Sequence, residues 1–263
     1  MLRVKTMVAM IKEKVTDVQH WNESLFSFKT SRQSNFTFEN GHFVMLGLEI
    51  EGRPLMRAYS IASANYEDEL EFFSIKVADG KLTSQLQHIK VGDEIVLSTK
   101  PTGTLVADHL LPGRHLYLIS TGTGLAPFMS IIKDPEIYDR FDKVILTHGV
   151  RTVSELAYQD VITHDLPNNE YFGDVIQEKL IYYPTVTREA YKNTGRLTDL
   201  MVSGKLFADI GLPVADPEQD RFMLCGSPSM LKDSCKILHD LGFTESRHGK
   251  QAHYVVERAF VEK

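Results

Sequence analysis

Short segments that alternate apolar and polar residues fill the chain up to about residue 110. They are rich in aromatic and β-branched residues, which favour strands. Dipeptides such as Asn40-Gly41 and Asp79-Gly80 separate them, because Asn and Gly tolerate the positive φ of tight turns. The pattern predicts an antiparallel β-barrel. Its segments are Leu25–Thr30, Phe36–Phe38, Phe43–Leu46, Leu70–Val77 and Glu94–Ser98.

After Leu111 the apolar residues form continuous runs instead. A turn containing Gly or Thr follows each run, and a stretch of helical length follows the turn. Unalternated runs separated by helices are typical of strands buried on both faces of a parallel sheet. We therefore predict a doubly wound α/β domain over residues 112–263, preceded by the barrel over residues 1–111. The runs are Leu116–Ser120, Val144–Val150, Leu180–Tyr183 and Phe222–Gly226.

Composition narrows the class of protein. The 263 residues include 29 Lys and Arg against 35 Asp and Glu, and this net charge of −6 argues against nucleic acid as the main partner. Cys225 and Cys235 form neither a disulfide framework nor a C-x-x-C pair, which favours a reducing compartment. No signal peptide or membrane-length apolar run is visible, so we expect a cytoplasmic protein with no membrane partner.

A Gly-rich turn, Ser120–Pro127, follows the first apolar run of the second half. Its backbone N–H groups, together with a helix that has Pro127 in its first turn, form a site for a pyrophosphate. The spacing is not G-x-G-x-x-G, so the motif alone fits a tight strand-to-helix connection equally well.

Arg57-Ala58-Tyr59-Ser60 brings a guanidinium, an aromatic ring and a hydroxyl together at the end of a predicted strand. Strict alternation directs Arg57 and Tyr59 to one side of the strand and Ser60 to the other, unless the strand end twists. Without further evidence, the run also fits an edge strand with one exposed Arg and one packed Tyr.

Two more turns join a strand to a helix. The segment Lys76–Leu86 has the general form of a P-loop, but Leu82 and Ile75 occupy positions where that motif needs Ser or Thr and Gly, which excludes a nucleoside triphosphatase. The segment Cys225–Met230 ends a central strand, where ligands bind in open α/β sheets. A buried structural thiol is the alternative for Cys225.

Four polar residues follow the second and third apolar runs: Arg151, Thr187, Arg188 and Arg196. A planar guanidinium suits a phosphate monoester, although solvated surface arginines are the alternative. The ten His residues include no H-E-x-x-H pair and no zinc spacing, so no metal site is predicted.

Taken in order, five motifs resemble the ferredoxin–NADP reductase family over essentially the whole chain. The tail and the run Arg57–Ser63 resemble the bacterial type in particular. The motifs are Arg57–Ser60, Gly80–Thr83, Gly122–Phe128, Cys225–Pro228 and Val256–Lys263.

The resemblance implies a non-covalently bound FAD. Arg57 would bind its pyrophosphate, Tyr59 would pack on the isoalloxazine and Ser60 would lie at the N5 edge. The tail has Ala259 where plastid-type members end in a Tyr that covers the flavin, and Phe260 would stack on the adenine, which implies slower turnover than the plastid type. The residues assigned to FAD are Arg57, Ala58, Tyr59, Ser60, Ile75, Lys76, Val77, Lys81, Leu82, Thr83, Thr123, Ala259 and Phe260.

The resemblance also implies NADP(H) as substrate, with the arginines on its 2′-phosphate side. Ser60 would act in catalysis, and Cys225 with Glu257 would position the nicotinamide. The residues assigned to NADP are Gly122, Gly124, Arg151, Thr187, Arg188, Arg196, Gly226, Ser227, Pro228 and Met230.

The implied function is electron exchange between NADPH and ferredoxin or flavodoxin, by a monomer. Two Cys residues cannot ligate a plant-type iron–sulfur cluster, so the cluster must belong to another protein. A free-flavin or siderophore reductase shares the same motifs and is the first alternative. A non-catalytic flavin-binding module is the remote one.

Overall fold

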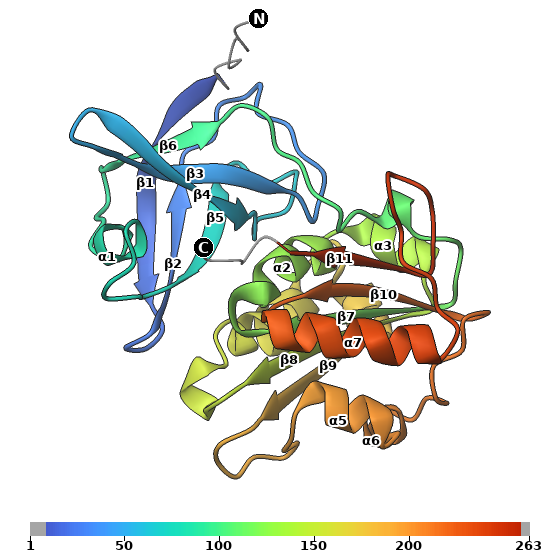
Figure 1. The fold of residues 1–263 in the computed structure, drawn as a ribbon. Helices are drawn as coiled ribbons and strands as arrows, with labels where there is room; N and C mark the ends of the chain where they lie inside the picture. The colour runs from blue at the N-terminus through green and yellow to red at the C-terminus, as the bar shows by residue number, and fades with distance from the viewer. Residues whose placement is uncertain (1–8, 259–263) are drawn as a thin grey trace, which may run out of the picture.

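A computed structural model describes residues 9–258, which form two domains (Figure 1). The first domain is an antiparallel sheet of six strands in the order β4-β3-β6-β1-β2-β5. A short helix, α1 (Thr83–Leu86), lies between the last two strands in sequence. The strands are β1 (Met10–His20), β2 (Leu25–Thr30), β3 (Phe43–Ile50), β4 (Arg53–Ser60), β5 (Leu70–Ile75) and β6 (Glu94–Ser98).

The sheet curves into a half-barrel, whose two edges approach each other where β4 ends. An antiparallel bridge joins Ile61, just after β4, to Phe72 of β5, and the backbone N–H of Ala62 donates to the Glu71 carbonyl at 2.8 Å. Aromatic and aliphatic side chains, with Phe26 and Phe28 of β2 among them, fill the interior.

The second domain is a five-stranded parallel sheet in the order β11-β10-β7-β8-β9. Its chain order reverses between β7 and β10, and the crevice at such a switch point is where ligands bind in open α/β sheets. The strands are β7 (His115–Thr121), β8 (Lys143–Val150), β9 (Leu180–Val186), β10 (Asp220–Cys225) and β11 (Tyr254–Glu257).

Helices cover both faces of the parallel sheet. Side chains from α2, α3 and α4 share an apolar cluster with Leu116 and Leu118 of β7, whereas those from α5, α6 and α7 share another with Tyr117 and Ile119. Successive residues of β7 thus enter opposite cores, which explains its unalternated apolar run. The helices are α2 (Ala126–Ile132), α3 (Pro135–Arg140), α4 (Gly173–Lys179), α5 (Leu197–Val202), α6 (Lys205–Asp209) and α7 (Pro228–Asp240). Short 3₁₀ or π turns are η1 (Ala107–His109), η2 (Gly122–Leu125), η3 (Val153–Glu155), η4 (Val161–Asp165) and η5 (Leu166–Asn168).

The predicted fold class, a barrel followed by a doubly wound domain, is confirmed. One predicted strand is wrong: Phe36–Phe38 has no strand pairing and lies in a loop. Both Phe rings are buried in the barrel core, and the guanidinium of Arg32 lies 4.9 Å from the Phe38 ring centre. The segment is therefore aromatic because its side chains fill the barrel, not because its backbone pairs.

Buried contacts fix the barrel against the parallel-sheet domain. The Tyr158 hydroxyl donates to the Glu71 carboxylate at 2.8 Å, and its ring centre lies 4.8 Å from that of Trp21. The Lys133 ammonium pairs with Glu67 at 2.9 Å and lies 3.8 Å from Glu71. No helix within residues 9–258 combines the length and the apolar character that crossing a membrane requires.

We predict that Tyr158→Phe lowers the free energy of unfolding by about 1–3 kcal/mol, because a buried carboxylate loses its hydroxyl donor. Urea denaturation measures the change. Tyr66→Phe is the matched control: the Tyr66 hydroxyl also donates across the domain boundary, to the Lys133 carbonyl at 3.0 Å, but this residue is 52% exposed and water can replace the bond. Equal destabilisation in the two variants would contradict the role assigned to Tyr158.

Candidate active site

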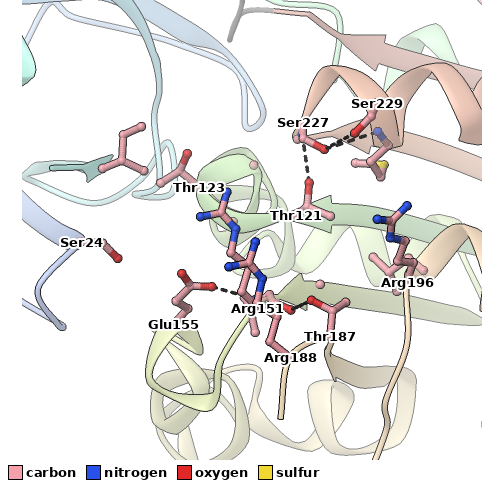
Figure 2. Close-up of a pocket in the computed structure, with 18 of the residues that line it drawn as sticks. Ser24, Thr121, Thr123, Arg151, Glu155, Thr187, Arg188, Arg196, Ser227 and Ser229 are labelled. Atoms are coloured by element: carbon pink, nitrogen blue, oxygen red, sulfur yellow. Dashed lines mark hydrogen bonds between the residues drawn. The ribbon is translucent and has the colours of Figure 1, made fainter. Parts of the chain in front are cut away.

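One cleft of about 850 Å³ lies between the two domains. Its floor is formed where β7, β8, β9 and β10 end, and its opposite wall comes from the barrel residues Ser24, Leu25 and Ile75 to Val77. Figure 2 shows side chains from both sides facing this space. The cleft therefore lies at the carboxyl edge of the parallel sheet, beside the switch point.

The turns after β7 and β10 are in close backbone contact. A Cβ on Gly124 would lie 2.3 Å from the Cys225 carbonyl oxygen, so only glycine fits there. Gly226 has φ +152, and a Cβ on it would lie 2.2 Å from the Thr121 hydroxyl. That hydroxyl accepts the backbone N–H of Ser227 at 2.9 Å (Figure 2). The glycines are thus required by packing, and together the turns form one rigid floor.

Arginines line the cleft where β8 and β9 end. The strand pairing of β8 and β9 continues beyond their ends, because the Arg188 N–H donates to the Arg151 carbonyl at 2.9 Å. The Glu155 carboxylate accepts the backbone N–H of Arg151 at 2.8 Å and so fixes this turn (Figure 2). Arg196 approaches from another segment, and none of these three guanidiniums forms an ion pair with the described residues. The arrangement suits a phosphate dianion.

Three of the residues predicted to bind the flavin cofactor lie at the end of β4. The Arg57 side chain is exposed and donates to the Met56 carbonyl at 2.9 Å. The Tyr59 hydroxyl lies 3.2 Å from the Ser74 hydroxyl. Ser60 is buried, and its hydroxyl has no hydrogen-bond partner within the described part of the chain. Tyr59 and Ser60 are both buried, whereas Arg57 is exposed.

An unpartnered buried hydroxyl such as that of Ser60 normally indicates a missing partner. Near α1, the backbone N–H groups of Lys81, Leu82 and Thr83 donate to no acceptor among residues 9–258. Both features fit a bound FAD, whose ring offers a hydrogen-bond acceptor and whose phosphates accept main-chain donors. The ammonium of Lys76 is already engaged, because it donates to the Asn22 carbonyl at 2.6 Å.

Cys225 and Glu257 are partners across the paired strands β10 and β11. The side chain of Cys225 is fully buried, and Glu257 is 8% exposed. Burial raises the pKa of the Cys225 thiol, and the nearby Glu257 carboxylate raises it further. Burial also raises the pKa of Glu257, although hydrogen bonds from Thr104 oppose this. The raised pKa disfavours the thiolate, which is the nucleophilic form of a cysteine.

The cleft brings together most of the residues predicted to bind nucleotide, and others lie outside its lining. Ala259 and Phe260 lie outside the described residues. Predicted residues in the lining are Ile75, Lys76, Val77, Gly122, Thr123, Gly124, Arg151, Thr187, Arg188, Arg196, Gly226, Ser227 and Met230. Predicted residues outside the lining are Arg57, Ala58, Tyr59, Ser60, Lys81, Leu82, Thr83, Cys225, Pro228 and Glu257.

Several residues of the lining were not predicted. Thr121 lies inside the Gly-rich turn, and its place directly after the strand could have identified it. Glu155 and Ser24 come from turns that only the tertiary fold brings to the cleft. The lining residues missed are Ser24, Leu25, Thr121, Gly149, Val150, Glu155, Gly195, Leu197, Thr198 and Asp233.

Comparison with known proteins agrees with this geometry. The sequence-family model of the oxidoreductase FAD-binding domain matches residues 11–106. The family model of the oxidoreductase NAD-binding domain matches residues 118–236. The fold and the shared cleft thus define the class, a two-domain oxidoreductase that uses a flavin and a pyridine nucleotide.

Relatives narrow the class. The chain is 66% identical to the ferredoxin–NADP reductase of Azotobacter vinelandii, over 95% of this chain and 98% of the relative. It is 49% identical to the flavodoxin/ferredoxin–NADP reductase of Rhodobacter capsulatus, over 95% of this chain and 93% of that one. A solved ferredoxin NADP+ reductase from Neisseria gonorrhoeae, with bound FAD and NADP, superposes with a TM-score of 0.87 at 31% identity, over 95% and 99% of the two chains. This chain belongs to the bacterial type of the ferredoxin–NADP reductase family, as its motifs indicated.

We predict that Gly124→Ala lowers kcat/KM for NADPH by about 100-fold, because the new methyl group pushes the two turns apart and misplaces the bound nucleotide. Gly211→Ala is the matched control. Gly211 has φ +71 but open space around its Cβ position and lies outside the cleft lining, so this variant costs about 1–2 kcal/mol of stability and leaves the contact between the turns intact. Steady-state kinetics decide: an unchanged kcat/KM in Gly124→Ala would contradict the prediction.

Proposed function

We propose that this chain holds FAD in the barrel and exchanges a hydride with NADP(H) bound across the parallel sheet. Ferredoxin or flavodoxin is the proposed electron carrier on the other side of the reaction. The observation that carries the proposal is the cleft walled by the barrel on one side and by the ends of four parallel strands on the other. A flavin reacts with a nicotinamide only when their reactive atoms meet, and a shared cleft permits that.

The barrel residues would hold FAD by complementary groups. Arg57 and the unused N–H groups of Lys81 to Thr83 are cationic or hydrogen-bond donors, as a pyrophosphate requires. The Tyr59 ring, fixed through the Ser74 hydroxyl, would pack on the isoalloxazine. Ser60 would donate its unpartnered hydroxyl to the N5 edge.

The parallel-sheet residues would hold NADP(H). Arg151, Arg188 and Arg196, with Thr187, would bind the 2′-phosphate end, because their guanidiniums are free of ion pairs with the described residues. The turn from Gly226 to Met230 would hold the nicotinamide end beside the floor formed with Gly124.

When bound, FAD supplies the redox chemistry, since it takes a hydride from the nicotinamide and passes its electrons on singly. The chain contributes orientation and electrostatics. Ser60 would donate a hydrogen bond, and Cys225 with Glu257 would position the nicotinamide from the strand ends behind the cleft floor.

Anaerobic mixing tests the proposed function. We expect NADPH to bleach the flavin absorbance of the purified protein, and ferredoxin or flavodoxin to restore it. If free flavin or a ferric siderophore reoxidises the protein, and neither ferredoxin nor flavodoxin does, the enzyme is a free-flavin or siderophore reductase instead. A flavin that NADPH does not bleach would contradict catalysis altogether.

The domain boundaries, the oligomeric state and the location are also proposals. We propose residues 1–111 as the FAD-binding domain and residues 112–263 as the NADP-binding domain. A cleft whose walls come from one chain supports a monomer, and two free thiols support a cytoplasmic location. Light scattering on the purified protein tests whether it is a monomer. A molecular mass twice that of the chain would contradict the proposal.

We predict that Ser60→Ala slows flavin reduction by NADPH about tenfold to 100-fold, since it loses one hydrogen bond to a group that gains charge. FAD should remain bound, because other residues hold its phosphates. Anaerobic stopped-flow absorbance measures the single-turnover rate. Ser98→Ala is the control, because Ser98 is another buried barrel hydroxyl but already contacts the Met45 N–H at 3.3 Å. A wild-type rate in Ser60→Ala would remove Ser60 from the mechanism.

We predict that Arg188→Gln raises KM for NADPH about tenfold to 100-fold while KM for NADH stays unchanged, since a charge-assisted bond to the 2′-phosphate is lost. Arg196→Gln should act in the same direction. Arg114→Gln is the control, because Arg114 pairs with Asp142 at 2.9 Å beside the start of β7, at the opposite edge of the sheet. Equal effects on NADPH and NADH would indicate ordinary surface arginines.

A further inference from the structure

Thr104 connects the segment after the barrel to the last strand of the parallel sheet. It lies between β6 and η1, 153 positions before Glu257. Its hydroxyl donates to the Val256 carbonyl at 2.8 Å. Its backbone N–H donates to the Glu257 carboxylate at 3.3 Å, and its hydroxyl lies 3.4 Å from the same carboxylate oxygen. Backbone and side chain of Thr104 therefore both hold the end of β11.

These contacts concentrate on one oxygen of Glu257. The carboxylate has Cys225 beside it on β10, and besides Thr104 the backbone N–H of the next residue, Arg258, also hydrogen-bonds to it. A buried carboxylate with few partners can rotate or take up a proton, and each hydrogen bond to it opposes both changes. The orientation of Glu257 thus depends on a residue of another segment.

We propose that Thr104 is a positioning residue, which fixes the Glu257 carboxylate at the nicotinamide end of the cleft. The proposal rests on the proposed function, because it assumes that Glu257 acts there. Thr104 belongs to the segment that connects the two domains. This segment lies outside the motifs assigned to FAD and NADP, so the proposal gives it a role in positioning a site residue. The exposure of Thr104 makes the residue replaceable without loss of a packed core.

The charged groups around Glu257 are few. The Cys225 thiol faces it from β10, and the guanidinium of Arg258 follows it in the chain, held by Glu245 at 2.9 Å. On the connecting segment, the ring of His109 lies 3.2 Å from the Thr104 carbonyl. Burial raises the pKa of Glu257, whereas the bonds from Thr104 and the charge of Arg258 lower it. Loss of the Thr104 hydroxyl therefore moves the pKa of Glu257 upward.

Thr104→Val tests the proposal, since it keeps the shape and the backbone N–H and removes only the hydroxyl. In the complete enzyme with FAD, stopped-flow flavin reduction by NADPH is followed across pH in four proteins: wild type, Thr104→Val, Glu257→Gln and the double variant. We expect the Glu257-dependent limb of the profile to shift to higher pH by about half a unit, which is about a threefold change in the rate on that limb. In the Glu257→Gln background the same substitution should have no further effect.

Two variants separate this role from a merely structural one. Thr104→Ser retains the hydroxyl and should restore the wild-type profile. Thr102→Val alters the same segment, but the Thr102 side chain makes no hydrogen bond with the described residues, so its profile should match the wild type. An unshifted limb in Thr104→Val, or a shift that Thr104→Ser does not reverse, would overturn the proposal. A limb that persists in Glu257→Gln would instead overturn the proposed role of Glu257.

Discussion

The close backbone contact between the turns that follow β7 and β10 is the constraint on which the rest of the site depends. Gly124 lies against the Cys225 carbonyl, and Gly226 lies against Thr121, so no side chain can separate the two turns. This contact places the Gly-rich turn, the buried thiol and the start of α7 at one point of the sheet edge. The edge becomes a rigid floor because it is backbone against backbone, which flexible side chains could not provide.

Contacts between the two domains fix the position of the barrel wall of the cleft. Leu25 and Phe73 of the barrel belong to the same apolar cluster as Leu116 and Leu118 of β7. The buried Tyr158–Glu71 bond adds a directional constraint to this apolar contact. Two separately built halves therefore meet with a defined spacing, as hydride transfer between ligands of different domains requires. The chain carries net negative charge, yet the cleft concentrates arginines, so its local charge is set by the fold and not by composition.

Much of the fold could be predicted from the sequence, because burial on two faces leaves a strong pattern. Leu25–Thr30 and Glu94–Ser98 have the predicted bounds. Strand β1 lacks such a signal, since most of its residues are at least partly exposed, and β11 is only four residues long. Site residues within one turn could be recognised together. Thr104 could not, because it acts through a contact between segments distant in the sequence. Glu155 accepts the N–H of Arg151, only four positions away, but no motif marks a lone carboxylate in such a turn. The roles of individual site residues remain predictions.

A crystal structure of the protein with FAD and NADP+ tests the account most directly, through the distance from the Ser60 hydroxyl to flavin N5. The unpartnered, buried hydroxyl predicts a hydrogen bond of about 3 Å there, with the nucleotide lying over the contact between the two turns. A flavin bound away from Ser60, or a nucleotide bound outside the cleft, would contradict the account.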